Sequence, residues 1–125
     1  MDNAIIERAQ VLYMRAQALE EQLHVIREQT AQLSDFQEQL RVFEQTEEKQ
    51  MLASLGKGVF VSAQLSDKKL WVDVGAGVLV KKDVSETRSI IEEQTQRLGE
   101  IREPFEEELS RLSEELEQLS SQLKN

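Results

Sequence analysis

The sequence predicts a mainly α-helical protein: a long antiparallel two-helix coiled coil with two short β-hairpins between its helices. Two observations predict this fold. Apolar residues recur every seven positions in both outer parts of the chain, as they do in coiled-coil helices. Between these parts, residues 55–83 change to the two-residue alternation of strands, with glycines at the breaks. A chain that leaves as a helix, passes through strands and returns as a helix has to fold back on itself.

The first helix is expected over about residues 3–49. Its seven-residue repeat is Ile5, Leu12, Leu19, Ile26, Leu33 and Leu40, with Ala9, Ala16 and Leu23 four residues after the first three. After Thr30 the apolar partners shift to Phe36 and Phe43, which predicts a stammer, a local overwinding of the supercoil.

The second helix is expected over about residues 84–124. Asp83 and Glu86 form a variant of the capping box at its start. Leu98, Phe105 and Leu112 belong to its seven-residue repeat, and the step from Ile101 to Phe105 to Leu109 predicts a stutter. Pro104 removes one backbone donor, and we expect a bend there because the repeat continues beyond it.

The two β-hairpins are expected over about residues 51–82. Glycine-containing segments at 56–58 and 75–77 separate the strands within each pair, residues 66–69 form a further turn, and the first strand, at 51–55, has the weakest pattern. Two such hairpins are marginal in water, and their unpaired edges invite strands from other chains. The sequence therefore predicts an oligomer.

Composition excludes several classes of function. One domain over residues 1–125 fits the length, and 31% charged against 5% aromatic residues is typical of long helices. The absence of cysteine removes thiolate metal sites and disulfides. The chain contains no apolar run of about 18 residues, and MDNAIIERAQ lacks the features of a signal peptide, so we expect a cytoplasmic protein without a membrane partner.

Charge is distributed unevenly along the chain. Residues 1–50 carry ten acidic and five basic side chains, residues 83–125 carry twelve and five, and residues 51–82 carry two and five. Acidic helices repel phosphate backbones, so nucleic acid is not an expected partner. The dense carboxylates at 106–108 and 114–115 point in different directions on a helix, and catalysis needs a recessed site with altered pKa values. We therefore expect no enzyme activity, no cofactor and no metal site.

The order of these segments resembles a known family. A helix, LGKGVFVSAQL, a charged turn, LWVDVGAGVLVKKD and a second helix are similar to the alpha-class subunit of prefoldin. Val72–Lys82, VDVGAGVLVKK, is the most specific part, and two hairpins rather than one are typical of the alpha class. The first strand departs from the family pattern, which often has a valine-proline-leucine stretch there.

This resemblance implies an ATP-independent holdase. Two alpha-class and four beta-class subunits would form a hetero-hexamer whose hairpins build a β-barrel platform. The tips of the coiled coils would bind non-native proteins, and a group II chaperonin would receive them. The implied partners are beta-class prefoldin subunits, a second copy of this chain, non-native clients and that chaperonin.

The resemblance also assigns two sets of residues. The expected assembly residues are Val59, Phe60, Val61, Leu65, Leu70, Val72, Val74, Val78 and Val80. The expected client-contact residues are Ile5, Ile6, Val11, Leu12, Tyr13, Leu116, Leu119 and Leu123. Several of the second set occupy seam positions and have an alternative role in holding the coiled coil, whereas Ile6, Val11 and Tyr13 flank the seam. The alternative function is a structural coiled-coil protein, a filament-forming or adaptor relative of prefoldin.

Overall fold

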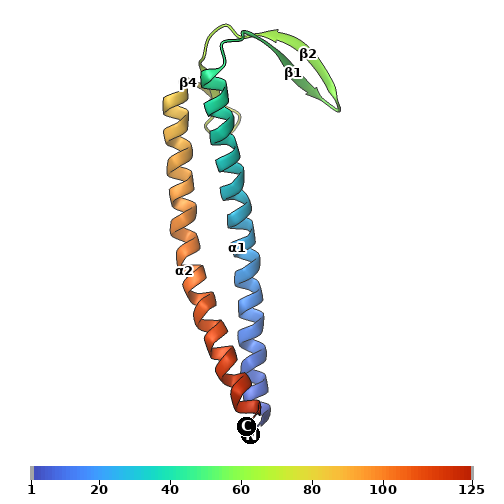
Figure 1. The fold of residues 1–125 in the computed structure, drawn as a ribbon, viewed down its shortest axis with the longest axis vertical. Coiled ribbons are helices and arrows are strands. Elements are labelled where there is room, and N and C mark those ends of the chain that lie inside the picture. The colour runs from blue at the N-terminus through green and yellow to red at the C-terminus, as the bar shows by residue number, and fades with distance from the viewer. Residues whose placement is uncertain (1, 125) are drawn as a thin grey trace. The chain divides into compact units, whose positions relative to one another are not determined.

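The computed structural model describes residues 2–124 as two helices separated by four strands (Figure 1). The elements in chain order are α1 (Asp2–Gln45), β1 (Gln50–Gly56), β2 (Val59–Gln64), β3 (Leu70–Asp73), β4 (Leu79–Lys82) and α2 (Val84–Lys124). This arrangement confirms the predicted fold class. The described residues form two compact units: the outer unit, made of the two outer parts of the chain up to Leu33 and from Gln94 onward, and the inner unit, Ser34–Glu93.

The end of α1 lies earlier than predicted. The helix ends at Gln45 rather than near residue 49. The Thr46 amide makes the last helical hydrogen bond, to the carbonyl oxygen of Val42 at 3.0 Å, and the Thr46 hydroxyl donates a second one to the same oxygen at 2.8 Å. The segment that follows contains no apolar residue to extend the seam. Strand β1 covers 51–55, the segment with the weakest strand pattern.

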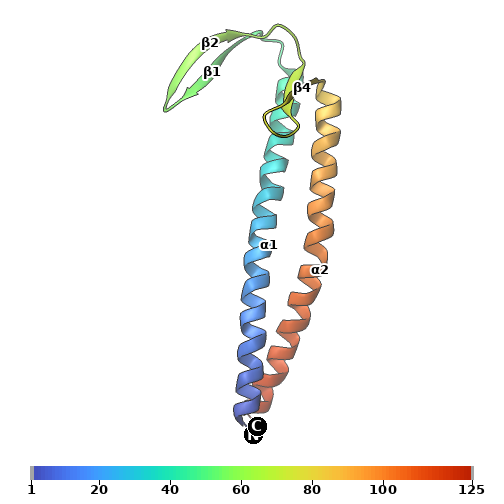
Figure 2. The ribbon, with the colours of Figure 1, turned by 180° about the vertical axis from the view of Figure 1, so that it is seen from behind.

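The two helices pack through an apolar seam and run antiparallel (Figure 2). Leu19 and Leu23 are fully buried. Burying side chains of this size is the main source of stability in a two-helix structure, since each contributes about 1.5–3 kcal/mol. The other buried apolar residues are Leu12, Ile26 and Leu40 on α1, and Val84 and Ile91 on α2.

The predicted stammer and stutter are both wrong. Phe36 is 40% exposed, and Gln37, four residues after Leu33, is half-buried in its place. Likewise Ile101 is 50% exposed, and Arg102 occupies the seam position. The seven-residue repeat therefore continues from Leu33 to Leu40 and from Leu98 to Phe105, with a polar side chain at one seam position in each stretch. The stammer and the stutter were predicted because only apolar residues were assigned to the seam.

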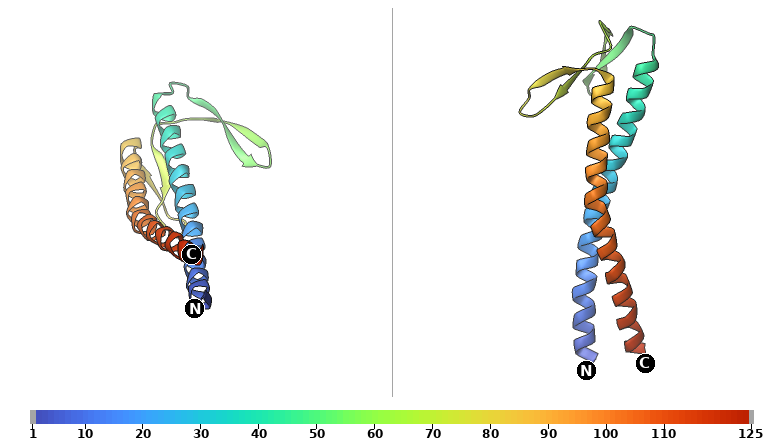
Figure 3. Two further views of the ribbon diagram at one scale, coloured as in Figure 1. Left: turned by 60° about the horizontal axis from the view of Figure 1, so that its bottom comes forward. Right: turned by 90° about the vertical axis from the view of Figure 1, so that its left-hand side faces the viewer.

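Helix α2 begins as predicted and does not end at Pro104. The Asp83 carboxylate accepts a hydrogen bond from the Glu86 amide at 2.7 Å, which is the expected N-cap. The helix runs through Pro104 to Lys124 (Figure 3). No helix within residues 2–124 is long and apolar enough to cross a membrane.

The N-cap predicts a pH dependence. The hydrogen bond from the Glu86 amide lowers the pKa of Asp83 below its ordinary value. The folded-state pKa therefore lies below the unfolded value of about 3.9, so the cap stabilises α2 above that pH and its contribution is lost as the pH falls through the folded pKa. We expect Asp83→Asn, which keeps a capping oxygen that does not titrate, to reduce the acid-side loss of helix measured by circular dichroism. Asp35→Asn, in the middle of α1, is the control, and an equal effect of both changes would contradict the prediction.

The four strands form two separate antiparallel hairpins. In the first, Met51 pairs with Ala63 and Leu52 with Ser62; in the second, Trp71 pairs with Lys81. Each hairpin closes through two residues with positive φ, Lys57–Gly58 (53° and 78°) and Ala76–Gly77 (52° and 75°). This mirror-image turn matches the twist of paired strands. The predicted turn at 66–69 is instead the linker between the hairpins.

Candidate assembly surface and helix tips

The first hairpin exposes apolar side chains on both of its faces. Because side chains alternate across a strand, Met51 and Val61 share one face, and Leu52 and Phe60 share the other. All four are exposed. A lone two-stranded sheet cannot cover either face, and both of its edges are free to pair.

The second hairpin has one exposed face and one partly covered face. Trp71 is 64% exposed and is paired with Lys81 of the neighbouring strand, on the same face of the hairpin. Leu79, also on this face, is exposed as well. On the opposite face Leu70 and Val72 are half-buried. Lys81 Nζ lies 5.7 Å from the centre of the Trp71 ring, a cation–π contact that leaves most of the indole open to solvent.

The hairpins contain no core of their own. Every residue from 50 to 82 is exposed or half-buried. Of the nine expected assembly residues, Leu65, Leu70 and Val72 are half-buried and the other six are exposed, namely Val59, Phe60, Val61, Val74, Val78 and Val80. Sequence analysis missed five further exposed apolar residues of the hairpins: Met51, Leu52, Leu55, Trp71 and Leu79. Their place in or beside the short strands of isolated hairpins was the signal available for them.

The outer ends of the helices expose a second set of apolar side chains. Ile6 and Tyr13, seven residues apart, lie on one flank of α1, whereas Val11 and Met14, three residues apart, lie on the side of α1 that faces away from the seam. All four are exposed, as is Leu123 of α2. Ile5, Leu116 and Leu119 are half-buried, whereas Leu12 is buried in the seam and is not accessible in this conformation. Sequence analysis did not include Met14 among the client-contact residues, although its position outside the seam indicated that it would be exposed.

Ion pairs join the helices along one flank of the outer unit. Arg8 pairs with Glu115 at 3.0 Å, and seven residues further along each helix Arg15 pairs with Glu108, also at 3.0 Å. Hydrogen bonding to Arg15 lowers the pKa of Glu108, and the same contact raises that of Arg15. Seven residues on again, the corresponding residues are Gln22 and Ile101, which carry no charge. An open groove follows, lined by Gln29, Gln32, Leu33, Gln94, Arg97 and Leu98.

Extending this series of ion pairs should stabilise the coiled coil. We expect Gln22→Arg with Ile101→Glu to add about 0.2–1 kcal/mol to the free energy of unfolding, the range for an exposed pair, measured by urea denaturation at low salt. High salt should remove the gain. The reversed pair, Gln22→Glu with Ile101→Arg, is the matched control and should behave alike. Each single change alone should give no gain, and a gain from either one would refute pairing as its cause.

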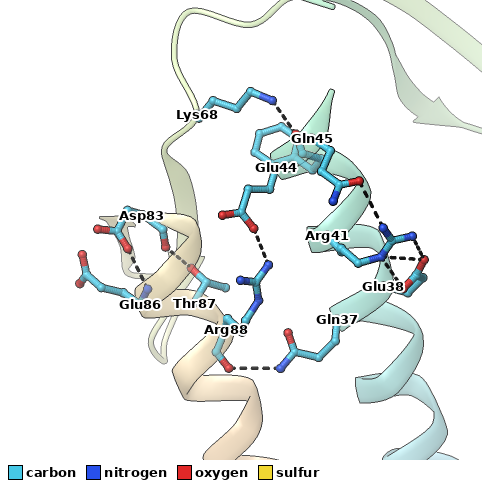
Figure 4. A network of polar contacts seen from close by, with 11 residues as sticks. Gln37, Glu38, Arg41, Glu44, Gln45, Lys68, Asp83, Glu86, Thr87 and Arg88 are labelled. Carbon is cyan, nitrogen blue, oxygen red and sulfur yellow. Dashed lines mark hydrogen bonds and ion pairs between the residues drawn. The ribbon is translucent and has the colours of Figure 1, made fainter. Parts of the chain in front are cut away.

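In the inner unit, polar contacts join the two helices and the linker between the hairpins (Figure 4). Arg88 Nη2 pairs with Glu44 Oε2 at 2.6 Å, and the Gln37 side-chain amide donates a hydrogen bond to the Arg88 carbonyl oxygen at 3.2 Å. The Lys68 ammonium group donates hydrogen bonds to the carbonyl oxygens of Phe43 and Thr46. These contacts tie the end of α1 to the first turns of α2 and to the linker.

Comparisons with known proteins agree with this geometry. The family model described as prefoldin subunit matches residues 13–125. Among solved structures, the chain is similar to one described as filamentous PFD from Methanocaldococcus jannaschii, with 19% sequence identity and a TM-score of 0.74, covering 92% of this chain and 97% of that one. At that identity the likeness concerns the fold. No curated protein matches the sequence. The match to the family model covers most of the chain, so the chain belongs to the prefoldin family.

Proposed function

We propose that this chain is an alpha-class prefoldin subunit, an ATP-independent holdase that works within a hetero-hexamer. The observation that carries the proposal is the pair of hairpins without a core, whose exposed apolar faces require other chains to cover them. Family membership supports a chaperone-type subunit that assembles with other prefoldin subunits. The presence of two hairpins supports the alpha class.

In this proposal the hairpins of six chains close a β-barrel platform. Two copies of this chain and four beta-class subunits contribute strands through the free edges of β1–β2 and β3–β4. Burial of apolar surface supplies the free energy, at about 25 cal/mol per Å². The contributing side chains are the nine expected assembly residues together with Met51, Leu52, Leu55, Trp71 and Leu79.

The outer helix ends bind non-native proteins, which pass to a group II chaperonin in the cytoplasm. The proposed contacts are the exposed residues Ile6, Val11, Tyr13, Met14 and Leu123, with the half-buried Ile5, Leu116 and Leu119 becoming available where the helix ends fray. Scattered apolar side chains on two sides of α1 suit weak, reversible holding of many different clients.

The first test is the solution mass, measured by light scattering after size exclusion, of the chain alone and mixed with a beta-class prefoldin. A discrete particle of six chains on mixing supports the proposal. That particle should then delay aggregation of a denatured client without nucleotide. Ile6→Ser with Tyr13→Ser should weaken this delay, and Glu7→Ser with Gln17→Ser on the same helix should not. A particle that fails to delay aggregation would refute holdase activity.

A structural role in a filament is the second candidate. The similar archaeal structure is described as filamentous, and free strand edges permit open-ended addition as well as ring closure. Concentration-dependent growth of the purified chain into long polymers would favour this candidate over the hexamer.

A further inference from the structure

Helix α1 ends without a positive charge of its own. Its last turn contains no basic residue, Glu44 lies within that turn, and Glu47 and Glu48 follow it. The carboxyl end of a helix carries partial negative charge and leaves carbonyl oxygens without helical donors. A cation from elsewhere in the chain would therefore stabilise this end.

Lys68 supplies that cation from the linker between the hairpins. Its ammonium group donates hydrogen bonds to the carbonyl oxygens of Phe43 and Thr46, and it lies 4.9 Å from the centre of the Phe43 ring. One side chain thus acts as a C-cap, balances the helix dipole and makes a cation–π contact. Figure 4 shows Lys68 extending from the linker to the end of α1.

The neighbouring residue, Asp67, bonds to the second hairpin. Asp67 Oδ2 accepts a hydrogen bond from Lys81 Nζ of β4 at 3.0 Å, and Oδ1 accepts one from the Lys69 amide at 2.9 Å. Lys81 in turn lies over Trp71 of β3. Two consecutive linker residues therefore bond to different elements, one to the end of α1 and the other to hairpin β3–β4.

We propose that Lys68, acting with Asp67, is a positioning residue for subunit assembly: it holds hairpin β3–β4 in a fixed orientation at the end of α1. A surface that is already ordered loses less conformational entropy when it binds. The exposed face with Trp71 and Leu79 would then already be in a fixed orientation when a neighbouring subunit binds to it. The consequence for assembly rests on the function proposed above, whereas the fixed orientation is a property of the chain alone.

Trp71 is the only tryptophan in the chain, so its fluorescence reports on this hairpin. In the purified chain, Lys68→Met should increase the amplitude of the fast phase of Trp71 anisotropy decay, on the order of twofold, because the hairpin gains local motion. Lys69→Met removes the same charge one residue later and should leave that amplitude unchanged. Lys68→Arg, which keeps a cation at this position, should keep the amplitude close to that of the unaltered chain. Equal amplitudes in the Lys68→Met and Lys69→Met chains would overturn the proposal.

Asp67→Asn provides a second route that leaves the α1 cap in place. It should increase the fast amplitude in the same direction, and combining it with Lys68→Met should add little, because either change breaks the same connection. Helix content from circular dichroism should fall by no more than the last turn of α1 in the Lys68→Met chains and should stay constant with Asp67→Asn alone. A fully additive double change would show that the two residues act separately and would overturn the coupled role.

Assembly gives the functional readout. On mixing with a beta-class prefoldin, Lys68→Met should raise the concentration needed for half-assembly on the order of tenfold relative to Lys69→Met. If the unaltered chain forms no particle, the proposed function fails while the anisotropy result still decides the orientation. If the particle forms equally well with Lys68→Met, the positioning role in assembly is refuted.

Discussion

Replacing Val61 by aspartate is expected to prevent assembly through the first hairpin. Val61 is exposed in the single chain and shares a face with Met51. Burying an unpaired carboxylate in an apolar interface costs several kcal/mol, and about 3 kcal/mol already weakens association by roughly 100-fold. Light scattering after size exclusion should show the mixture with a beta-class prefoldin remaining as small species at concentrations where the unaltered chain forms a particle.

The adjacent residue provides the matched control for this change. Ser62 lies one position along β2 and therefore on the opposite face, and it is already polar and exposed. Ser62→Asp introduces the same charge in place of a side chain that is already polar, so no apolar contact is lost and the cost should be smaller than at Val61. If both variants assemble as well as the unaltered chain, the first hairpin is not part of the interface. If only Ser62→Asp blocks assembly, the face with Leu52 and Phe60 is the buried one.

Truncating Leu23 to alanine is expected to produce a large loss of stability. Leu23 has no solvent exposure, so the truncation removes buried contacts and leaves a cavity in the seam. Leucine-to-alanine changes at buried sites cost about 2–5 kcal/mol. This is a large share of the stability of a two-helix coiled coil, so urea denaturation followed by circular dichroism should show a much lower midpoint.

Leu123→Ala is the control, because it makes the same truncation at an exposed position of the repeat. It separates the contribution of buried packing from that of helix propensity. Leu123 is 44% exposed near the end of α2, and Leu123→Ala should change the free energy of unfolding by about 0.5 kcal/mol or less. A similar loss at both positions would mean that burial in the single chain does not determine the stability of the coiled coil.

Sequence periodicity was sufficient for the helices, whose repeat extends over many residues, and for the short strands because glycines mark the breaks within each pair. It failed where a polar residue occupies a seam position: Gln37 and Arg102 have side chains long enough to place aliphatic carbons in the seam, so the helices need not shift to bury Phe36 or Ile101. The end of α1 was also misplaced, because residues 46–49 contain no apolar residue by which the repeat could mark where the helix stops.

The candidate surfaces were predicted only in part. The family resemblance indicated the hairpin valines and the helix ends, and the exposed side chains at these places support that choice. It did not indicate Trp71, because the exposure of a strand residue depends on its cross-strand partner and on which face of the hairpin is covered. The Lys68 contacts to residues 22 and 25 positions earlier were beyond any local pattern.

Burial is distributed differently along the two helices, and this has a consequence for their dynamics. Buried side chains extend from Leu12 to Leu40 on α1 but only from Val84 to Ile91 on α2. Local opening costs least where few side chains are buried. Backbone amides of α2 beyond Gly99 should therefore exchange with deuterium faster than those of α1 between Leu19 and Ile26. One helix would then serve as a persistent rod, while the other opens and closes along it.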